Sequence, residues 1–300
     1  MFSVIVCTYN RDAYIYNTLK CIATNDFPTN DCEIVVVNNN STDNTEQECI
    51  RFRNDYPKAN FLYIVEYQQG LSFARNRGIQ ESKGDFIIFL DDDAYIANDY
   101  LKNLRQALLQ QTDIFAFGGK IIPLYESGKE PYWMSPRLAP VVSAIDLGND
   151  VIQFPKNSYP IGANMGFRRS CIEQVGYFNT SLGRTKKNLI GGEEKDFFAR
   201  IRDSKLAIYY VPTALAQHVI PASRTTEEYV VKMAYGVGAS EILRCNSLSK
   251  KICAIAKELY KWLGTIALWL IYMLKGKFDW AKMIVRFRWN VSKGLLTYKV

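Results

Sequence analysis

The chain has 300 residues, of which 48% are hydrophobic and 22% charged, and a formal net charge of +7. This composition is ordinary for a globular protein with a sizeable core, and it excludes a largely disordered chain. The seven cysteines are scattered, and none forms a Cys-x-x-Cys pair, which argues against a disulfide framework or a thiolate zinc site. This cysteine usage fits the reducing cytoplasm, and the first residues show no signal-peptide pattern.

The positive charge is concentrated in the C-terminal part of the chain. Residues 244–300 contain twelve Lys or Arg and two acidic residues, a balance of +10, so residues 1–243 sum to −3. Such an asymmetry between a mildly acidic body and a basic tail indicates a separate role for the tail.

The first 120 residues alternate short apolar runs with amphipathic stretches, the pattern of β-α-β units on a mainly parallel sheet. The predicted strands are Phe2–Thr8, Glu33–Asn38, Asn60–Glu66, Asp85–Leu90 and Ile114–Ile121. The predicted helices are Ala13–Ala23, Asn44–Asn54, Leu71–Ser82 and Asp99–Gln110. An α/β sheet of this Rossmann-like type, flanked by helices, binds ligands at the carboxyl ends of its strands. The segments to inspect are therefore residues 8–11, 38–43, 66–70 and 91–93.

Periodicity fades between Pro123 and Pro160, where Pro, Gly, Ser and aromatic residues are frequent. A loop of this length inside a compact domain is usually functional. Regular elements are predicted again at Gly162–Arg168, Ser170–Val175, Glu194–Ser204 and Ala207–Val211. From about Thr225 onward the pattern is helical only, so residues 223–300 are predicted to form a helical C-terminal extension.

The strongest chemical signal is a run of three carboxylates. The apolar strand Phe86–Leu90 delivers Asp91, Asp92 and Asp93 to the ligand-binding edge, and adjacent anions repel unless a cation is present. Carboxylate oxygens suit Mg²⁺ or Mn²⁺, which also bind phosphate oxygens and water. Because side chains alternate along a strand, Asp91 and Asp93 can face one pocket while Asp92 points elsewhere. The alternative interpretation is a solvated acidic turn that caps the next helix.

Three other segments place this acidic run in a wider pattern: SVIVCTYNR at residues 3–11, EIVVVNNNSTD at residues 33–43 and GLSFARNRG at residues 70–78. In order and spacing they resemble the nucleotide-binding half of family 2 glycosyltransferases with the GT-A fold, whose Asp-x-Asp motif corresponds to residues 91–93. The resemblance extends from residue 2 to about residue 220. It implies a nucleotide-sugar-binding half at 1–122, an acceptor-binding and catalytic half at 123–222, and inverting transfer of the kind used in bacterial polysaccharide assembly.

The resemblance also assigns roles to single residues. Nucleotide binding falls to Thr8, Tyr9, Asn10, Arg11, Asn39, Arg75, Asp91 and Asp92. Asn39 could form hydrogen bonds with a uracil-like edge, which favours a UDP-sugar. Many relatives have Asp at this position, so the identity of the base is left open. The ligands of Mn²⁺ or Mg²⁺ would be Asp93, Asp91 and His218. For Arg75 the alternative is a surface salt bridge, and for His218, the single histidine, a structural role.

A second acidic motif lies in the other half, where Gly191 and Gly192 precede Glu193 and Glu194. It resembles the family's Glu-Asp motif, whose second acid is the catalytic base of inverting enzymes. The resemblance therefore implies Glu194 as the base, with Glu193 beside it, although Glu is one methylene longer than Asp. The alternative is simple stabilisation of a helix N-terminus by negative charge. We expect sugar contacts in the same half, from Gly162, Asn164 and Trp133.

The tail contains one apolar run, Trp262–Leu274, of thirteen residues between lysines. A spanning helix needs roughly 20 apolar residues, so a helix that lies in the membrane interface fits better. The alternative is an amphipathic core or dimer helix, and the oligomeric state stays open. Nucleic acid is not expected as a partner, because phosphate-binding surfaces rarely include so apolar a run.

These features predict a glycosyltransferase that is peripheral on the cytoplasmic face of the cell membrane. The acceptor would be a hydroxyl of a glycan or a polyprenyl-linked sugar in surface polysaccharide or glycolipid synthesis. A sugar nucleotidyltransferase is one alternative, but it needs a glycine-rich phosphate loop, and Thr8–Asp12 contains no glycine. A non-catalytic nucleotide-sugar-binding scaffold is the other, but such a protein is expected to lose the acidic residues that this sequence retains.

Overall fold

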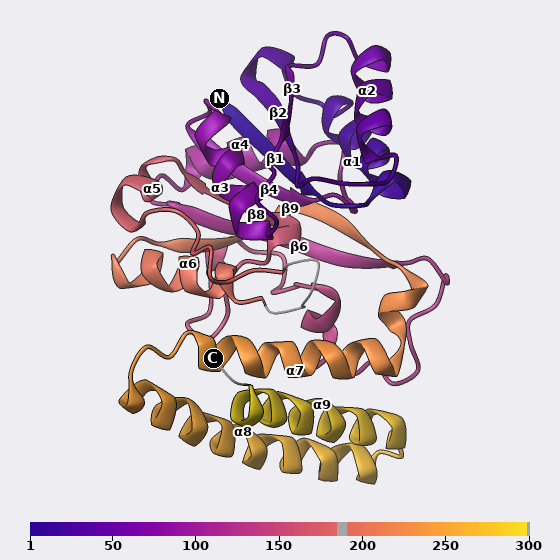
Figure 1. The fold of residues 1–300 in the computed structure, drawn as a ribbon, viewed down its shortest axis with the longest axis vertical. Coiled ribbons are helices and arrows are strands. Elements are labelled where there is room, and N and C mark those ends of the chain that lie inside the picture. The colour runs from indigo at the N-terminus through magenta and orange to yellow at the C-terminus, as the bar shows by residue number, and fades with distance from the viewer. Residues whose placement is uncertain (185–190, 299–300) are drawn as a thin grey trace. The chain divides into compact units, whose positions relative to one another are not determined.

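The computed structural model describes residues 1–184 and 191–298 (Figure 1). The chain divides into two compact units. The first comprises Met1–Pro123, Ser143–Thr180 and Glu193–Val219, and the second comprises Leu124–Val142, Ser181–Gly192 and Ile220–Val300. The predicted segment 123–222 is therefore shared between both units, because its strands complete the sheet of the first one. The functional division at residues 122 and 222 stays a prediction.

Four parallel strands form one half of the sheet, in the order β3-β2-β1-β4. They are β1 (Phe2–Thr8), β2 (Cys32–Asn38), β3 (Phe61–Val65) and β4 (Phe86–Asp91). The register pairs Thr8 with Asn38 and Cys7 with Asp91, so the carboxyl ends of β1, β2 and β4 lie level. The ligand-binding edge predicted from the sequence therefore exists as one row of strand ends.

Helices cover both faces of the sheet because its strands are apolar on both sides. Val4 and Val6 of β1 belong to one core cluster, and Ile5 between them belongs to the other. The first cluster also contains side chains of α1 (Asp12–Ala23), α2 (Thr45–Asp55) and α4 (Tyr100–Gln110). The second also contains side chains of α3 (Leu71–Glu81), α5 (Ser170–Val175) and α6 (Glu193–Asp203). These six helices confirm the predicted pattern, with boundaries shifted by a residue or two.

The other half of the sheet is antiparallel, so the sheet is mixed rather than mainly parallel. Its strands are β8 (Met165–Arg168), β6 (Ala116–Tyr125), β9 (Ile208–Ile220), β5 (Ala94–Ile96) and, paired with β9, β7 (Ile152–Gln153). Strand β9 is longer than predicted. The sequence suggested an end near Pro212, which lacks a backbone donor, but pairing of Ala94 with His218 continues the strand. The short turns η1 (Thr29–Asp31), η2 (Ala139–Val142), η3 (Gly162–Asn164) and η4 (Ala222–Thr225) complete the connections.

The described residues of the second unit contain three long helices, which confirm the predicted helical extension (Figure 1). They are α7 (Glu227–Leu243), α8 (Leu248–Leu274) and α9 (Phe278–Thr297). Gly238 and Gly294 allow α7 and α9 to approach closely, since a Cβ at either position would overlap the backbone of the facing helix. Among the described residues, no helix combines the length and the apolar character needed to cross a bilayer.

Candidate active site

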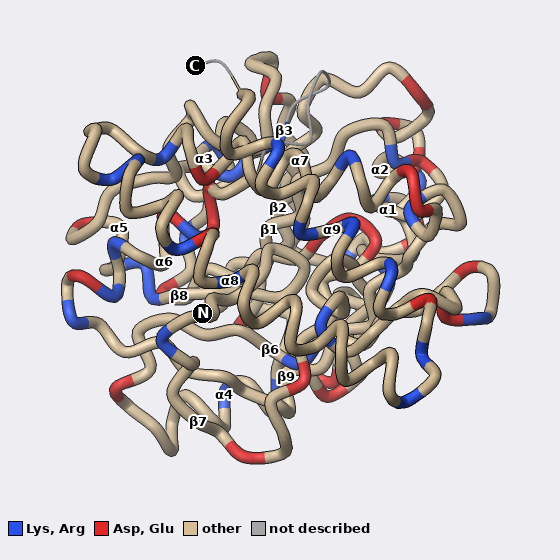
Figure 2. The backbone as a smooth tube through the Cα atoms, turned by 90° about the horizontal axis from the view of Figure 1, so that it is seen from below, with Lys and Arg blue, Asp and Glu red and all other residues tan. Residues whose placement is uncertain are grey.

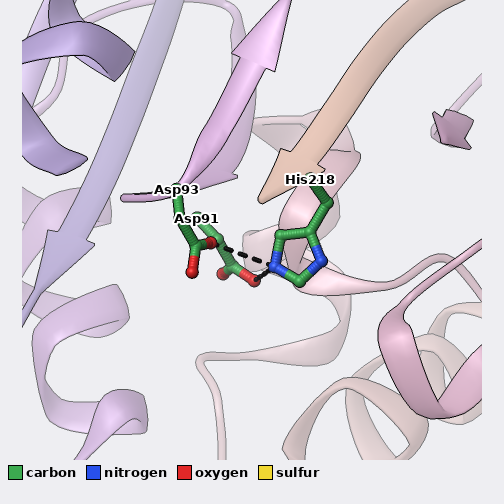
Figure 3. Close-up of side chains that lie close together, drawn as sticks. All are labelled: Asp91, Asp93 and His218. Atoms are coloured by element: carbon green, nitrogen blue, oxygen red, sulfur yellow. Dashed lines mark ion pairs between the residues drawn. The ribbon is translucent and has the colours of Figure 1, made fainter. Parts of the chain in front are cut away.

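Asp91, Asp93 and His218 converge at the carboxyl end of the parallel strands (Figure 3). Their potential ligand atoms all lie within 4.8 Å of one another. His218 Nε2 is 3.0 Å from Asp93 Oδ1 and 3.8 Å from Asp91 Oδ2. The Asp93 and His218 side chains are buried, whereas that of Asp91 is 37% exposed, so the cluster is accessible from one side. Two carboxylates and an imidazole form a donor set that fits Mn²⁺ or Mg²⁺.

Arg11 supplies positive charge to the same acidic run. It is the N-cap residue that precedes α1, and its guanidinium contacts Asp93 through Nη2 and Asp92 through Nε, the latter at 3.1 Å. Asp92 is not part of the group formed by Asp91, Asp93 and His218; it lies with Asp93 in the turn between β4 and β5. Burial raises the pKa of Asp92, and Arg11 opposes this shift. Thr8 lies at the end of β1 beside this group and is itself buried, whereas Tyr9 is partly exposed.

Asn10 and Asn39 mainly hold loops at this edge. Asn10 has a left-handed backbone with φ of 53°, and its Oδ1 accepts a hydrogen bond from Thr42 N at 2.8 Å. Asn39 donates to the carbonyls of Glu66 at 3.0 Å and Gln68 at 2.7 Å. Its Oδ1 also accepts from Gly70 N at 2.8 Å. Both amide hydrogens of Asn39 are therefore donated to groups of the protein itself. Its contact with a nucleobase stays a prediction, and it would have to be made by Oδ1 as an acceptor.

A second cluster joins Arg75 to the acidic pair at the start of α6. Arg75 Nη1 is 3.0 Å from Glu193 Oε1, and Arg75 Nη2 is 2.9 Å from Glu194 Oε1. Gly162 N also donates to Glu194 Oε1, at 2.9 Å. The side chains of Arg75 and Glu193 are 2% and 4% exposed, and that of Glu194 is 18% exposed. Glycine is favoured at position 162, because a Cβ there would overlap the ends of the Arg75 and Glu194 side chains and displace them.

The electrostatics of this cluster suit proton transfer near neutral pH. Burial raises the pKa of Glu194 to about 7; Arg75 opposes the shift, and Glu193 and Asp91 add to it. A carboxylate with a pKa close to the working pH is an efficient general base, because it is ionised often enough and still binds the proton. The cluster therefore contains a group that could remove a proton from an acceptor hydroxyl.

Arg75 is buried, which corrects the alternative interpretation of a surface salt bridge, and its place near the phosphates of a nucleotide stays a prediction. It occupies the buried face of α3, one helical turn from the buried Ile79, and its Cζ lies 5.7 Å from the ring centroid of Phe89 and 5.4 Å from that of Phe178. Its spacing from Leu71 and Ile79 could have revealed this, since residues four apart share one face of a helix. No feature of the sequence indicated that its partners would be Glu193 and Glu194.

The residues predicted to contact sugars have different surroundings. Asn164 is fully buried: its amide donates to the carbonyls of Ala214 at 2.7 Å and Lys120 at 3.1 Å, and Tyr100 Oη donates to its Oδ1 at 2.6 Å. These hydrogen bonds give Asn164 a structural role, and its contact with a sugar stays a prediction. Gly162 lies at the Glu194 carboxylate. Trp133 is buried in the second unit, and its predicted contact with a sugar stays a prediction.

An α/β sheet with an Asp-x-Asp motif at its strand ends and a buried acidic pair defines the GT-A class of glycosyltransferases. The profile of the glycosyl transferase family 2 matches residues 3–176, and the chain belongs to this family. The protein is therefore a glycosyltransferase, as the sequence predicted.

Relatives with assigned activities agree with this classification. The chain is 25% identical to the glucosyl-dolichyl phosphate glucuronosyltransferase of Haloferax volcanii over 251 residues, which cover 80% of this chain and 75% of that protein. It is 37% identical to the poly(ribitol-phosphate) β-N-acetylglucosaminyltransferase TarS of Staphylococcus aureus over 102 residues, 34% of this chain and 18% of that protein.

Solved structures share the fold. A mannosyltransferase from Pyrobaculum calidifontis, in complex with GDP-Man and Mn²⁺, superposes with a TM-score of 0.66 at 18% identity and covers 99% of this chain and 88% of its own. Residues 1–349 of TarS in complex with UDP-GlcNAc superpose with a TM-score of 0.57 at 22% identity, covering 97% of this chain and 81% of that one. The predicted GT-A fold is thereby confirmed.

Proposed function

We propose that this glycosyltransferase transfers a sugar, with inversion at the anomeric carbon, from a nucleoside-diphosphate sugar to an acceptor hydroxyl. The observation that carries the proposal is the presence, in one compact unit, of an Asp-Asp-His cluster suited to a metal and a buried glutamate whose pKa is raised to about 7. The first can bind a diphosphate through a cation, and the second can accept a proton. Both functions assist an inverting displacement, the base by activating the acceptor hydroxyl and the cation by stabilising the leaving diphosphate.

Asp91, Asp93 and His218 would hold Mn²⁺ or Mg²⁺. The bound cation would neutralise the negative charge that develops on the departing nucleoside diphosphate. Arg11 already contacts Asp92 and Asp93, so it is placed to lend positive charge to the same diphosphate. The segment Thr8–Arg11 and Asn39 would line the nucleoside site, and a UDP-sugar remains the favoured donor.

Glu194 would act as the catalytic base. Arg75 and Gly162 N fix its Oε1, so Oε2 is the oxygen that would receive the proton from the acceptor. Arg75 would act as a positioning residue, because it holds the carboxylate and opposes the rise in its pKa. The attacking oxygen and the departing diphosphate must lie on opposite faces of the sugar ring, which assigns Glu194 and the metal cluster to opposite sides of the donor.

The acceptor would be a glycan or a polyprenyl-linked sugar, presented at the cytoplasmic face of a membrane. The Haloferax relative, named for a dolichyl phosphate substrate, supports a lipid-linked acceptor. Attachment of the basic C-terminal helices to the membrane surface would bring the active site to such an acceptor.

Thermal denaturation with nucleoside diphosphates and their sugars, with and without Mn²⁺, tests the proposal before the acceptor is known, since a ligand of the native state raises the melting temperature. We expect stabilisation by one nucleoside diphosphate that depends on the cation. Glu194→Gln should keep this stabilisation and lose sugar transfer by roughly 10²-fold or more. Transfer at the wild-type rate by Glu194→Gln would refute the assignment of the base, and cation-independent nucleotide binding would refute the role of the metal cluster.

A further inference from the structure

The hairpin of α8 and α9 has its polar groups inside. Glu258 is 6% exposed and accepts hydrogen bonds from Arg288 Nη1 at 3.2 and 3.3 Å and from Ser292 Oγ at 2.9 Å. Trp262 Nε1 donates to Ser292 Oγ at 2.9 Å, and Arg288 Nε donates to Thr265 Oγ1 at 3.3 Å. The two helices are therefore joined by a hydrogen-bonded polar network.

The outer side of α8 is apolar along its whole length. Large aliphatic side chains recur every three or four residues and are exposed, from Leu248 at 72% to Leu274 at 89%. This apolar stripe consists of Leu248, Ile252, Ile255, Leu259, Leu263, Ile266, Leu270 and Leu274. Residues at this spacing share one side of a helix. A helix that faces water normally has the reverse arrangement, with its apolar side packed and its polar side outward.

Cations occupy the other flank of α8. Lys250, Lys257 and Lys261 of α8 and its C-cap residue Lys275 are exposed, and the helical period places them on one line opposite the apolar stripe. Glu258, the one acid within α8, is buried in the polar network, and its Oε2 also lies 3.8 Å from Lys261 Nζ. The cationic residues of both helices can be followed in Figure 2, which colours Lys and Arg blue. Helix α8 therefore combines an exposed apolar side with a cationic side that no exposed acid on the same helix neutralises.

We propose that α8 lies in the plane of an anionic lipid bilayer, with its apolar stripe among the acyl chains and its lysines among the phosphate headgroups. This inference rests on the proposed function at a membrane surface, and it names the residues and the lipid chemistry that make the attachment. An interfacial helix buries its apolar face at the boundary between headgroups and acyl chains, so its cationic flank lies at the level of the headgroups. The polar network faces α9 and is satisfied within the protein, as an apolar surrounding requires.

Charge favours a bilayer over a second copy of the chain. Two copies docked through α8 would bring together helices whose exposed charges are all positive, without the acidic partners that normally flank a helix–helix seam. The apolar surface is also wider than such a seam, because Tyr260 and Ile271, outside the stripe, are 76% and 44% exposed. An anionic lipid surface matches both features.

Flotation of the full-length protein with lipid vesicles tests this inference. We expect binding to vesicles of phosphatidylcholine with phosphatidylglycerol to exceed binding to pure phosphatidylcholine by about tenfold, because each lysine near an anionic surface adds to the attraction. The double variant Ile266→Glu/Leu270→Glu should lose binding to the mixed vesicles by about tenfold or more, since it places two charges in the apolar stripe. The variant Lys250→Gln/Lys257→Gln should lose most of the preference for phosphatidylglycerol.

A matched control adds the same two charges elsewhere. Ile50 on α2 and Leu109 on α4 are 48% and 71% exposed, so Ile50→Glu/Leu109→Glu should bind vesicles like the wild type. Equal losses in the two double variants would overturn the inference. A second outcome would also overturn the inference. In it, the wild type binds neither vesicle type and is a dimer by light scattering, and Ile266→Glu/Leu270→Glu is a monomer.

Nucleotide binding separates this inference from the proposed function. The thermal shift with nucleoside diphosphate and Mn²⁺ depends on the first unit, so it should be unchanged in Ile266→Glu/Leu270→Glu. A wild-type protein that does not bind vesicles but is still stabilised by nucleoside diphosphate and Mn²⁺ would refute the membrane inference alone. A protein that binds vesicles but shows no rise in melting temperature with nucleoside diphosphate and Mn²⁺ would refute the proposed donor site. The membrane inference for α8 would then still hold.

Discussion

Replacement of Arg75 by methionine would leave two carboxylates in the core without their cation. Arg75 contacts Glu193 at 3.0 Å and Glu194 at 2.9 Å, and the guanidinium is 2% exposed. Removing one partner of a buried ion pair typically costs about 3–5 kcal/mol, because the remaining charge stays desolvated. We expect a loss of this size in the free energy of unfolding at neutral pH, since methionine has a similar length but no charge.

The loss should grow with pH, and its sign follows from the protonation of Glu194. In the wild type the pKa of Glu194 is raised from 4.5 to about 7. Ionisation of this group therefore lowers the free energy of unfolding progressively from about pH 4.5 to pH 7. Above about pH 7 the group is ionised in both the folded and the unfolded state, so the free energy of unfolding no longer changes with pH on its account. Without Arg75, which opposes the shift, the pKa rises further and the unfavourable slope continues above pH 7. That slope is at most about 1.4 kcal/mol per pH unit for one carboxylate, so the difference between the two proteins should increase by up to about 2 kcal/mol from pH 7 to 8.5.

Urea denaturation at pH 6, 7 and 8.5 measures this difference, and hydrogen exchange of the α3 amides assigns it to the first unit. Arg77→Met is the matched control on the same helix, because Arg77 is 42% exposed and its pair with Glu81 is a surface pair. Such pairs contribute only about 0.2–1 kcal/mol. Similar losses for Arg75→Met and Arg77→Met, or a loss at Arg75 that shrinks above pH 7, would refute the reasoning.

Three further predictions, two of them with a comparison variant, test other parts of the structure. Asp93→Asn should abolish Mn²⁺-dependent stabilisation by nucleotide, because it removes a metal ligand, whereas the exposed Asp85→Asn should retain it in the same thermal assay. Gly162→Ala should lower the free energy of unfolding by about 1–3 kcal/mol through overlap with the buried ion pairs. Gly264→Ala, whose Cβ would meet nothing within 4 Å on α8, should instead raise it by about 0.5–1 kcal/mol. Asn39→Ala should speed hydrogen exchange in the loop before α3 and cost about 2–4 kcal/mol, since three hydrogen bonds are lost.

For two of these variants, the opposite outcome would contradict the proposed active site directly. A full Mn²⁺-dependent shift in Asp93→Asn would show that the Asp-Asp-His cluster does not bind the cation. A stable Gly162→Ala protein with normal transfer would show that the approach of Gly162 to Glu194 is not needed to hold the base.

The sequence by itself determined the parallel half of the sheet, its helices and the place of the acidic motif. Local periodicity was sufficient there, because each strand of Val and Ile is buried on both faces and each crossover helix is amphipathic. The three aspartates could be placed at the ligand edge because they follow β4 directly in the chain. Similarly, a helical tail with an apolar run between lysines was visible without coordinates.

The tertiary structure alone decided which distant residues meet. The pairing of β9 with β5 brings His218 to Asp93, more than a hundred residues away in the chain, and no local pattern specifies that register. The same holds for Arg75 and Glu194: burial creates their interaction and raises the pKa of the glutamate. The reversed polarity of the α8–α9 hairpin was hidden for a related reason, because the period of a helix shows that one side is apolar but not which side a neighbouring helix covers.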